Sequence, residues 1–320
     1  MTSRENVAAV FRGTLPRRVP ARDEIPHETA LRWRKDKSVG QGDIEAYFDF
    51  DIACFGFEQS FGAGRKTIDK ALMQDARKAL QKSLPRERRT LFEKPTIGKA
   101  ITSASWTRAL VHGQAKAFCF FEPFGFFSWV AGTQKALFEL TRIPRVTLED
   151  FFERYRERVC GLYETMRQQG YAFELAWGWG DIAYARGLYF DEAFYREVLY
   201  KFHKQLFGFF KAQGLSCVFH SDGNIEPVLS LLKDAGVDAV HPLDTTAMDA
   251  VRIKKKYPEL VLFGGVALEH LYAASWRGLR AQLEDLAEKG RFIYSLSSPV
   301  PHDVPCDRYR KFLETVKEAL

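Results

Sequence analysis

The sequence predicts an α/β protein built as a single (β/α)8 TIM barrel. Short apolar segments alternate with helical segments along the C-terminal half of the chain. These segments are apolar almost throughout, which is typical of strands buried on both faces of a parallel sheet. Neither glycine-rich phosphate-binding motif of the open nucleotide-binding sheets occurs. The length of 320 residues suits one barrel, which typically needs about 250.

Four strand-then-helix units follow one another from residue 215 to the last residue. The predicted strands are rich in Val, Leu, Ile and Phe, and each is followed by a segment with helical spacing. This repetition favours βα units around a parallel sheet. The predicted strands are residues 215–220, 236–242, 259–266 and 291–297, and the predicted helices are residues 225–235, 246–256, 276–289 and 307–320.

The first half of the chain is less regular. Residues 171–179 predict a strand that precedes a helix over 192–211, and residues 116–121 predict a strand that precedes a helix over 148–168. Further towards the N-terminus, residues 50–56 suggest a strand and residues 66–82 suggest a helix. No linker or internal repeat divides the chain. We therefore expect one domain over residues 1–320, with an irregular N-terminal segment up to about residue 110.

Composition excludes several classes of protein. The formal net charge is +6, but no dense Lys/Arg block with interleaved aromatic residues is present, so we expect no nucleic-acid partner. The five cysteines are scattered and form no CxxC pair, which is typical of reduced thiols in a cytoplasmic protein. The longest aromatic stretch is too short to span a bilayer, so we expect no membrane partner.

Ionisable residues gather where the predicted strands end. In a (β/α)8 barrel the active site lies at the C-terminal ends of the strands, so these residues are candidates for catalysis. A histidine and carboxylates at one mouth are suited to proton transfer. The alternative for Asp222 is a turn or helix cap in Asp222-Gly223-Asn224. The predicted catalytic residues are His220, Asp222, His302 and Asp181, and His241 lies at the end of a neighbouring strand.

A second set of residues is predicted to bind the substrate. Gly264 and Gly265 end one predicted strand and permit close approach of the backbone at the mouth. Trp179 and Asp244 end two other strands. His302 lies among three prolines, which exclude a regular helix and make its loop stiff.

Several motifs together resemble the uroporphyrinogen decarboxylase superfamily, including its decarboxylase-like branch and its corrinoid-linked methyltransferases. The most specific motif is FHSDGNIEPVLSLLKDAGVDAVHPLD at residues 219–244. Similar motifs lie at 46–52 (AYFDFDI), 129–145, 180–191, 262–271 and 301–316. The resemblance implies a (β/α)8 barrel with a deep mouth, and a homodimer. It also makes Asp51 a substrate-binding candidate, because the family's substrate-holding Asp occupies a similar Phe-x-Asp-Ile run. The alternative for Asp51 is a strand-end or capping carboxylate.

Two departures from the family bear on the chemistry. The Arg-rich N-terminal signature that holds porphyrinogen carboxylates is absent. The methyltransferase branch holds zinc with His-x-Cys and a distant Cys, whereas His220 is followed here by Ser221 and Asp222. We therefore expect no metal and no cofactor. If zinc is present, its expected ligands are His220, Asp222 and Cys306.

The expected function is a decarboxylase-type lyase that acts on a carboxylated cyclic or aromatic small molecule by metal-free acid/base catalysis. One alternative is a corrinoid-dependent methyltransferase or O-demethylase with a zinc site, whose partner would be a corrinoid protein. A second alternative is a non-catalytic barrel that binds a small molecule. Fold alone does not distinguish these functions.

Overall fold

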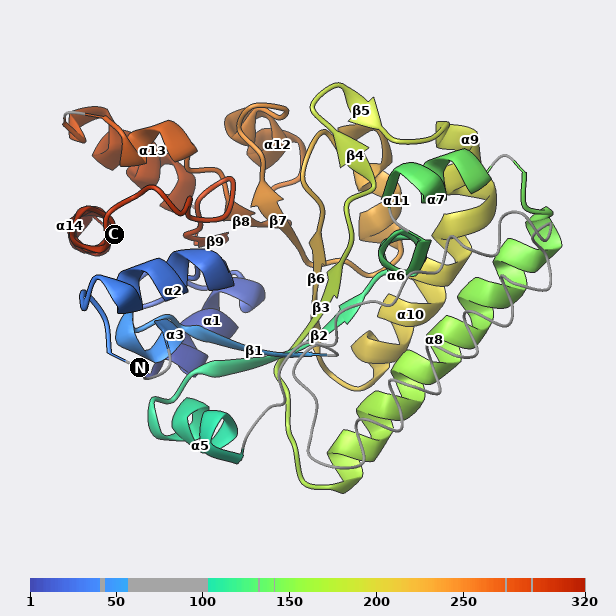
Figure 1. Cartoon of the computed structure of the whole chain (residues 1–320), viewed down its shortest axis with the longest axis horizontal. Coiled ribbons are helices and arrows are strands. Elements are labelled where there is room, and N and C mark those ends of the chain that lie inside the picture. Colours follow the sequence, from blue (N-terminus) through green and yellow to red (C-terminus); the bar gives the residue numbers. More distant parts are fainter. Residues whose placement is uncertain are drawn as a thin grey trace.

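Seven parallel strands form the central sheet of the protein (Figure 1). The computed structural model describes residues 1–40, 44–56, 103–131, 133–140, 142–273, 275–288 and 290–319. All neighbouring strand pairs of this sheet are parallel. In spatial order the strands are β1 (Ile52–Gly56), β2 (Ala115–Phe121), β3 (Leu175–Trp179), β6 (Ser216–His220), β7 (Ala239–Leu243), β8 (Val261–Gly264) and β9 (Phe292–Ile293). The predicted parallel α/β architecture is confirmed.

The sheet curls around its own small core. Every second residue of each strand points to the inside of the curl, as the pleat requires. Val7 and Val10 of α1 (Ser3–Arg12) pack against this inner face. The strand residues of the inner core are Ile52, Ala115, Ala117, Leu175, Trp177, Val218, Ala239, Val261, Phe263 and Ile293. The inner residues at the carboxyl ends of the strands are therefore the ones that face the mouth of the curl.

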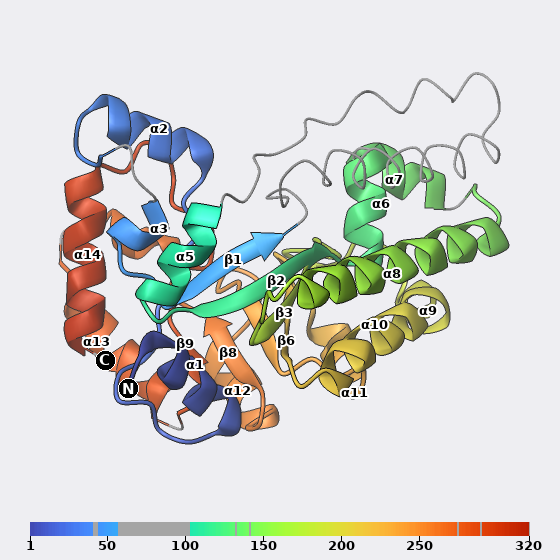
Figure 2. The ribbon, with the colours of Figure 1, turned by 90° about the horizontal axis from the view of Figure 1, so that it is seen from below.

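Helices cover the outer face of the sheet. In both ribbon views the long helix α8 (Arg145–Gln168) runs beside α10 (Tyr200–Ala212) (Figures 1 and 2). Phenylalanine side chains fill the layer between these helices and β2: Phe118 and Phe120 pack against Phe210. The other helices are α2 (His27–Lys35), α3 (Ile44–Tyr47), α5 (Ser103–Val111), α6 (Pro123–Ala131), α7 (Thr133–Leu140), α9 (Glu192–Phe194), α11 (Leu229–Asp234), α12 (Ala250–Lys256), α13 (Arg277–Ala287) and α14 (Cys306–Ala319).

The segment around Ala21 lies between the two outer strands of the sheet. Tyr294, just after β9, forms a parallel bridge with Ala21, and Arg22 N donates to Tyr294 O at 3.0 Å. On the other side, Asp51 N donates to Ala21 O at 2.9 Å, directly before β1. These hydrogen bonds draw the edges of the curled sheet towards each other. A complete eight-stranded barrel is not confirmed by the described residues, because the segment around Ala21 makes only an isolated bridge.

The predicted N-terminal segment contains regular structure in its described part. α1, α2 and α3 lie between residues 3 and 47, and β1 follows at the predicted position. The helix predicted over residues 66–82 lies outside the described residues. A further two-stranded hairpin, β4 (Ala183–Tyr184) with β5 (Gly187–Leu188), follows β3. Among the helices that the structure describes, none is both long and apolar enough to cross a membrane.

Gly264 permits a close contact between β8 and β7. Its φ is +126°, a region that other residues rarely adopt, and an added Cβ would lie 2.5 Å from the backbone nitrogen of Leu243. We expect Gly264→Ala to lower the free energy of unfolding by about 2 kcal/mol or more, because the backbone must shift. Chemical denaturation measures this change.

Gly208 supplies the matched control for that substitution. It lies within α10, and nothing approaches the position of its missing Cβ within 4 Å. Gly208→Ala is expected to stabilise the protein by up to about 1 kcal/mol, because alanine favours a helix. Equal effects of the two substitutions would contradict the proposed contact at Gly264.

Candidate active site

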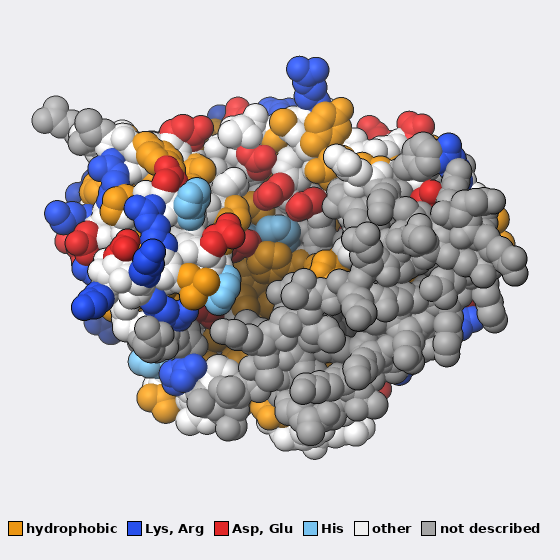
Figure 3. Space-filling model, viewed as in Figure 1, with side chains coloured by type: hydrophobic (Ala, Val, Ile, Leu, Met, Phe, Trp, Pro, Cys, Tyr) orange, Lys and Arg blue, Asp and Glu red, His pale blue; other side chains and the backbone are white. Residues whose placement is uncertain are grey.

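A cavity of about 380 Å³ lies at the carboxyl end of the curled sheet. Figure 3 shows a hollow with hydrophobic side chains inside it and acidic and imidazole side chains nearby. The lining combines aromatic and aliphatic side chains with a few polar groups, which is the usual composition of a small-molecule site. The lining residues are Arg22, Glu24, Ile25, Pro26, Ile44, Glu45, Phe50, Cys54, Gly56, Cys119, Phe120, Phe121, Trp179 and Pro299.

Two imidazoles meet where β6 and β7 end. His220 and His241 are direct neighbours across these strands. Each lies two residues after an inner-core residue, Val218 or Ala239, so the pleat turns both imidazoles inwards. Their Nδ1 atoms are 2.8 Å apart, so one nitrogen donates a hydrogen bond to the other. Both side chains are buried.

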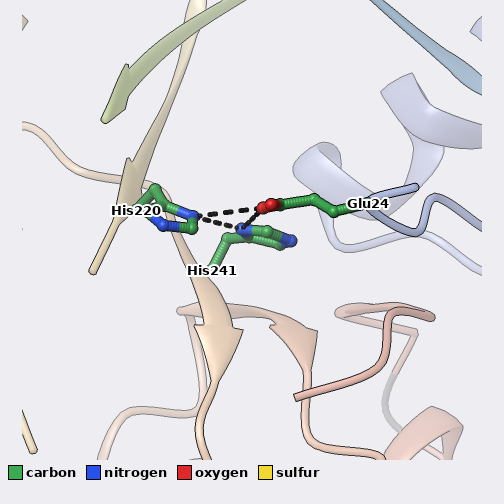
Figure 4. A group of neighbouring side chains, drawn as sticks. All are labelled: Glu24, His220 and His241. Atoms are coloured by element: carbon green, nitrogen blue, oxygen red, sulfur yellow. Dashed lines mark hydrogen bonds and ion pairs between the residues drawn. The ribbon is translucent and has the colours of Figure 1, made fainter. Parts of the chain in front are cut away.

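Glu24 completes this cluster from the other end of the chain. It follows the segment around Ala21 and precedes α2, and its carboxylate points at the two imidazoles (Figure 4). Its Oε1 lies 3.6 Å from His220 Nδ1 and 3.8 Å from His241 Nδ1. This oxygen is buried, and no described residue offers it a hydrogen bond. An unpaired buried oxygen is costly, which suggests that Glu24 serves a ligand or a reaction.

Tryptophans hold the imidazoles in an apolar setting. Trp179 stacks on His220 with ring centroids 4.2 Å apart, and Trp177 meets His241 edge-on at 4.7 Å. Burial lowers the pKa of His220 to about 4, against a smaller opposing effect of Asp181. Burial also lowers the pKa of His241 well below its usual value, with a contribution from His220. Both rings are therefore neutral at neutral pH.

The pKa of Glu24 moves in the opposite direction. It is raised to about 8, mainly by burial and also by the charges of Asp222 and Asp181, against an opposing effect of Arg22. The side chain is therefore largely protonated at neutral pH. A protonated carboxyl group beside neutral imidazoles is a candidate general acid.

Asp181 and Asp222 connect the cluster to the surface. Asp181 Oδ1 lies 3.6 Å from His220 Nε2, and its side chain is 46% exposed. It also accepts a hydrogen bond from Asp222 N at 3.0 Å. The pKa of Asp222 is raised to about 7, first by burial and then by the charges of Asp181 and Asp244. Asp181, His220 and Glu24 thus form a row of ionisable groups that leads from solvent into the cavity, with 3.6 Å between neighbouring groups.

The structure brings four of the predicted residues together: Asp181, His220, Asp222 and Trp179. Asp244 lies next to them, but its oxygens accept from Gly223 N and Thr246 N, so it holds the adjacent turns. Gly264 and Gly265 both have positive φ. Gly264 serves packing against Leu243, and neither glycine is among the described residues that line the cavity.

Three other predicted residues are not brought to the cluster. Asp51 precedes β1 and so lies at the amino end of the strand, opposite the mouth, where it is fully buried against Arg18. His302 is exposed, and among the described residues no hydrogen bond or ion pair reaches its imidazole. Cys306 is buried at the start of α14, where Arg310 donates to its sulfur.

Sequence reasoning missed Glu24, Arg22 and the partnership of His220 with His241. For His241 the sequence held a signal. Both His220 and His241 lie two positions after an apolar strand residue that faces inwards, so the strand period predicts that both face the same side of the sheet. For Glu24 and Arg22 no signal was available, since their segment has neither strand nor helix periodicity. Their place depends on long-range contacts with the carboxyl end of the chain.

The cluster has donor groups that fit a divalent metal ion. One ligand atom from each of Glu24, His220 and His241 lies within 4.8 Å of the others, and the same holds for Asp181, His220 and Asp222. Imidazole and carboxylate ligands suit zinc. The thiolate that the sequence analysis considered is not part of either group, because Cys306 lies elsewhere.

Fold and cluster together define an α/β protein whose ionisable side chains converge at the carboxyl edge of a curled parallel sheet, as in barrel enzymes. Residues 181–319 match the family described as uroporphyrinogen decarboxylase (URO-D). A methyltransferase from Methanosarcina mazei has a similar structure, with a TM-score of 0.63 and 12% sequence identity over 99% of this chain and 98% of that chain. Comparison with curated proteins gives no match.

Over residues 181–319 this match confirms the resemblance to the uroporphyrinogen decarboxylase superfamily that the sequence motifs indicated. The matched segment includes Asp181, His220, Asp222 and His241. Glu24 and Arg22 lie outside it. The similarity to the methyltransferase shows a shared fold.

Proposed function

We propose that the protein is a decarboxylase-type lyase that acts on a carboxylated cyclic or aromatic small molecule in the cavity. The observation that supports this most directly is the buried Oε1 of Glu24, which has no hydrogen-bond partner among the described residues and lines the cavity beside two neutral imidazoles. A group of this kind can deliver a proton to a developing carbanion.

Arg22 is the proposed contact for an acidic group of the substrate. It lines the same cavity, and its Nε is buried with no hydrogen-bond partner among the described residues. Its Nη2 pairs with Glu45 at 2.6 Å, which fixes the guanidinium in place. An acceptor oxygen of the substrate would satisfy the free Nε–H, and a carboxylate is the group that arginine binds best.

The proposed reaction breaks the bond between the carboxylate carbon and the ring or its substituent. The electron pair stays on the substrate, where a conjugated ring can delocalise it, and CO₂ leaves. Glu24 then gives its proton to the substrate carbon that has lost the carboxylate. Asp181 and His220 return a proton from solvent to Glu24. The apolar walls of the cavity solvate the negative charge of the carboxylate poorly. They therefore favour a reaction in which the carboxylate leaves as neutral CO₂.

The test is a panel of cyclic and aromatic carboxylic acids, followed by thermal denaturation and by detection of released CO₂. We expect at least one acid to raise the melting temperature and to lose CO₂. In the Arg22→Met variant this acid should raise the variant's own melting temperature much less. A panel in which amides and alcohols of the same ring systems stabilise the protein equally would contradict the role of Arg22.

Methyl transfer is the second candidate, favoured by the donor set of Glu24, His220 and His241 and by the fold shared with a methyltransferase. These three residues would hold a zinc ion, which when bound lowers the pKa of a coordinated thiol or water. A corrinoid protein is the proposed partner in that case. Elemental analysis of protein purified without chelators distinguishes the candidates: about one zinc per chain, lost in Glu24→Gln, supports methyl transfer.

A further inference from the structure

Cys54 of β1 and Cys119 of β2 form a pair of thiols on the wall of the cavity. Cys54 lies opposite Ala117, and Gly56 lies opposite Cys119, so both thiols point to the inner face of the same strand pair. Gly56 leaves the space beside Cys119 open, since an added Cβ there would lie 2.9 Å from the Cβ of Cys119. Both cysteines are partly exposed and carry free thiols.

Two groups stabilise a negative charge on Cys54. Arg22 Nη2 donates to its sulfur at 3.6 Å, and the thiol of Cys119 projects from the same face of the neighbouring strand, where its sulfur donates to Ala117 O at 3.8 Å. The neighbouring thiol of Cys119 first, and then Arg22, lowers the pKa of Cys54, whereas the burial of Cys54 and the charge of Glu45 oppose this effect. Burial raises the pKa of Cys119, so this thiol keeps its proton. The pair is thus unequal, because Cys54 has the lowered pKa and Cys119 keeps its proton.

The other three cysteines differ from Cys54 in exposure and in pKa. Cys160, Cys217 and Cys306 are buried. Burial raises the pKa of Cys160 to about 11, and it raises the pKa of Cys217 and Cys306 as well. They serve as internal controls, because a buried neutral thiol is a poor nucleophile.

The strand register opposes a disulfide between the two thiols. They are diagonal neighbours, two residues apart along strands about 4.8 Å apart, so their Cα atoms are separated by about 8 Å. A disulfide needs less than about 7 Å unless the backbone moves. The thiols can approach each other across this diagonal, but a covalent bond between them would strain β1 and β2.

We propose that Cys54 is a modification site: a nucleophilic thiolate, supported by Cys119 and Arg22, that reacts with peroxides and soft alkylating agents entering the cavity. With a peroxide, the sulfur attacks one oxygen, the O–O bond breaks, and the other oxygen leaves as hydroxide or alkoxide. The sulfur is oxidised to a sulfenic acid and the peroxide is reduced. The added oxygen would lie in the cavity beside Arg22.

The first experiment measures alkylation of the full-length protein by iodoacetamide, with the site identified by mass spectrometry of proteolytic peptides. At neutral pH we expect Cys54 to react at least about tenfold faster than Cys160, Cys217 and Cys306. Equal rates, or faster reaction of Cys119, would overturn the proposal. No substrate is needed, so this result is independent of the proposed lyase activity.

Variants at Cys119 test whether this thiol raises the reactivity of Cys54 or whether Cys54 reacts only because it is exposed. Cys119→Ala removes the donor and should slow alkylation of Cys54 several-fold, with the rate profile displaced to higher pH. Cys119→Ser keeps a hydroxyl donor and should restore most of the rate. A Cys54 rate that is the same in all three proteins would show that Cys119 plays no part and would overturn the pairing.

The product of peroxide treatment gives the last test. Dimedone, which labels sulfenic acids, should attach to Cys54 in protein treated with hydrogen peroxide, and added thiol should reverse the oxidation. A Cys54–Cys119 disulfide, seen as a loss of two hydrogens without dimedone labelling, would overturn the sulfenic acid assignment. Absence of any oxidation at Cys54 would overturn the proposal as a whole.

Discussion

Glu24→Gln is expected to reduce turnover by at least about 100-fold, the usual contribution of a positioned general acid. Glutamine has nearly the same shape and keeps an oxygen near His220 and His241, but it has no acidic proton to give. The assay is CO₂ release from the carboxylic acid that the panel identifies. Glu28→Gln, four residues later on an exposed position of α2, is the matched control and should be fully active.

The pH dependence of the same enzyme follows from the raised pKa of Glu24. Wild-type activity should fall as the pH rises through about 8, because Glu24 then loses the proton that it must donate. The charges around it are those of Arg22, Asp222, Asp181 and Asp23, and the neutral imidazoles face it from β6 and β7. If the fall in activity near pH 8 persists unchanged in Glu24→Gln, the group that titrates there is not Glu24.

Glu24 also predicts a change in stability that needs no substrate. Its pKa is about 8 in the folded protein and 4.5 ordinarily, so folding favours the protonated form. The contribution of Glu24 to stability should therefore be lost as the pH rises from 4.5 to 8, because only the unfolded chain releases this proton freely. Glu24→Gln lacks this contribution, so the wild-type protein should lose stability relative to the variant over the same window. Identical pH profiles of unfolding free energy would contradict the raised pKa.

Asp51→Asn is expected to lower the free energy of unfolding by about 2 kcal/mol, because the buried carboxylate loses hydrogen bonds that its charge strengthens. Asp51 is fully buried and accepts two hydrogen bonds from Arg18, at 2.8 and 2.7 Å. Its Oδ2 also accepts from Ala21 N at 2.8 Å. The NH₂ group of the asparagine would face the N–H groups of Arg18 or Ala21, with which it cannot form hydrogen bonds. This change would weaken the attachment of the segment around Ala21 to β1.

Asp49→Asn is the matched control for Asp51. Asp49 is 67% exposed and pairs with Lys317 at 3.7 Å, so its loss should change the unfolding free energy by less than about 1 kcal/mol. Chemical denaturation of both variants gives the comparison. Unchanged stability of Asp51→Asn together with weakened binding of the carboxylic acid would restore the substrate-binding role that the sequence suggested for Asp51.

The sequence alone was sufficient for the repeated βα units and for part of the site. Apolar runs such as residues 215–220 predict buried strands because burial on both faces leaves no polar alternation. The residue at the end of such a run must lie at the carboxyl edge of the sheet, so His220 and Asp222 were predictable as neighbours of a mouth. That His241 is the partner of His220 became known only from the register of β6 with β7.

Only the tertiary structure decided which groups complete the site. Glu24 and Arg22 reach the cavity because backbone hydrogen bonds hold the segment around Ala21 between Tyr294 and Asp51. Asp51 is separated from the cluster by the direction of a strand, and His302 lies on an exposed loop. Periodicity reports whether a residue is buried within its own element, whereas these placements depend on contacts between distant parts of the chain. The pairing of Cys54 with Cys119 likewise required the register of β1 with β2, which no local pattern encodes.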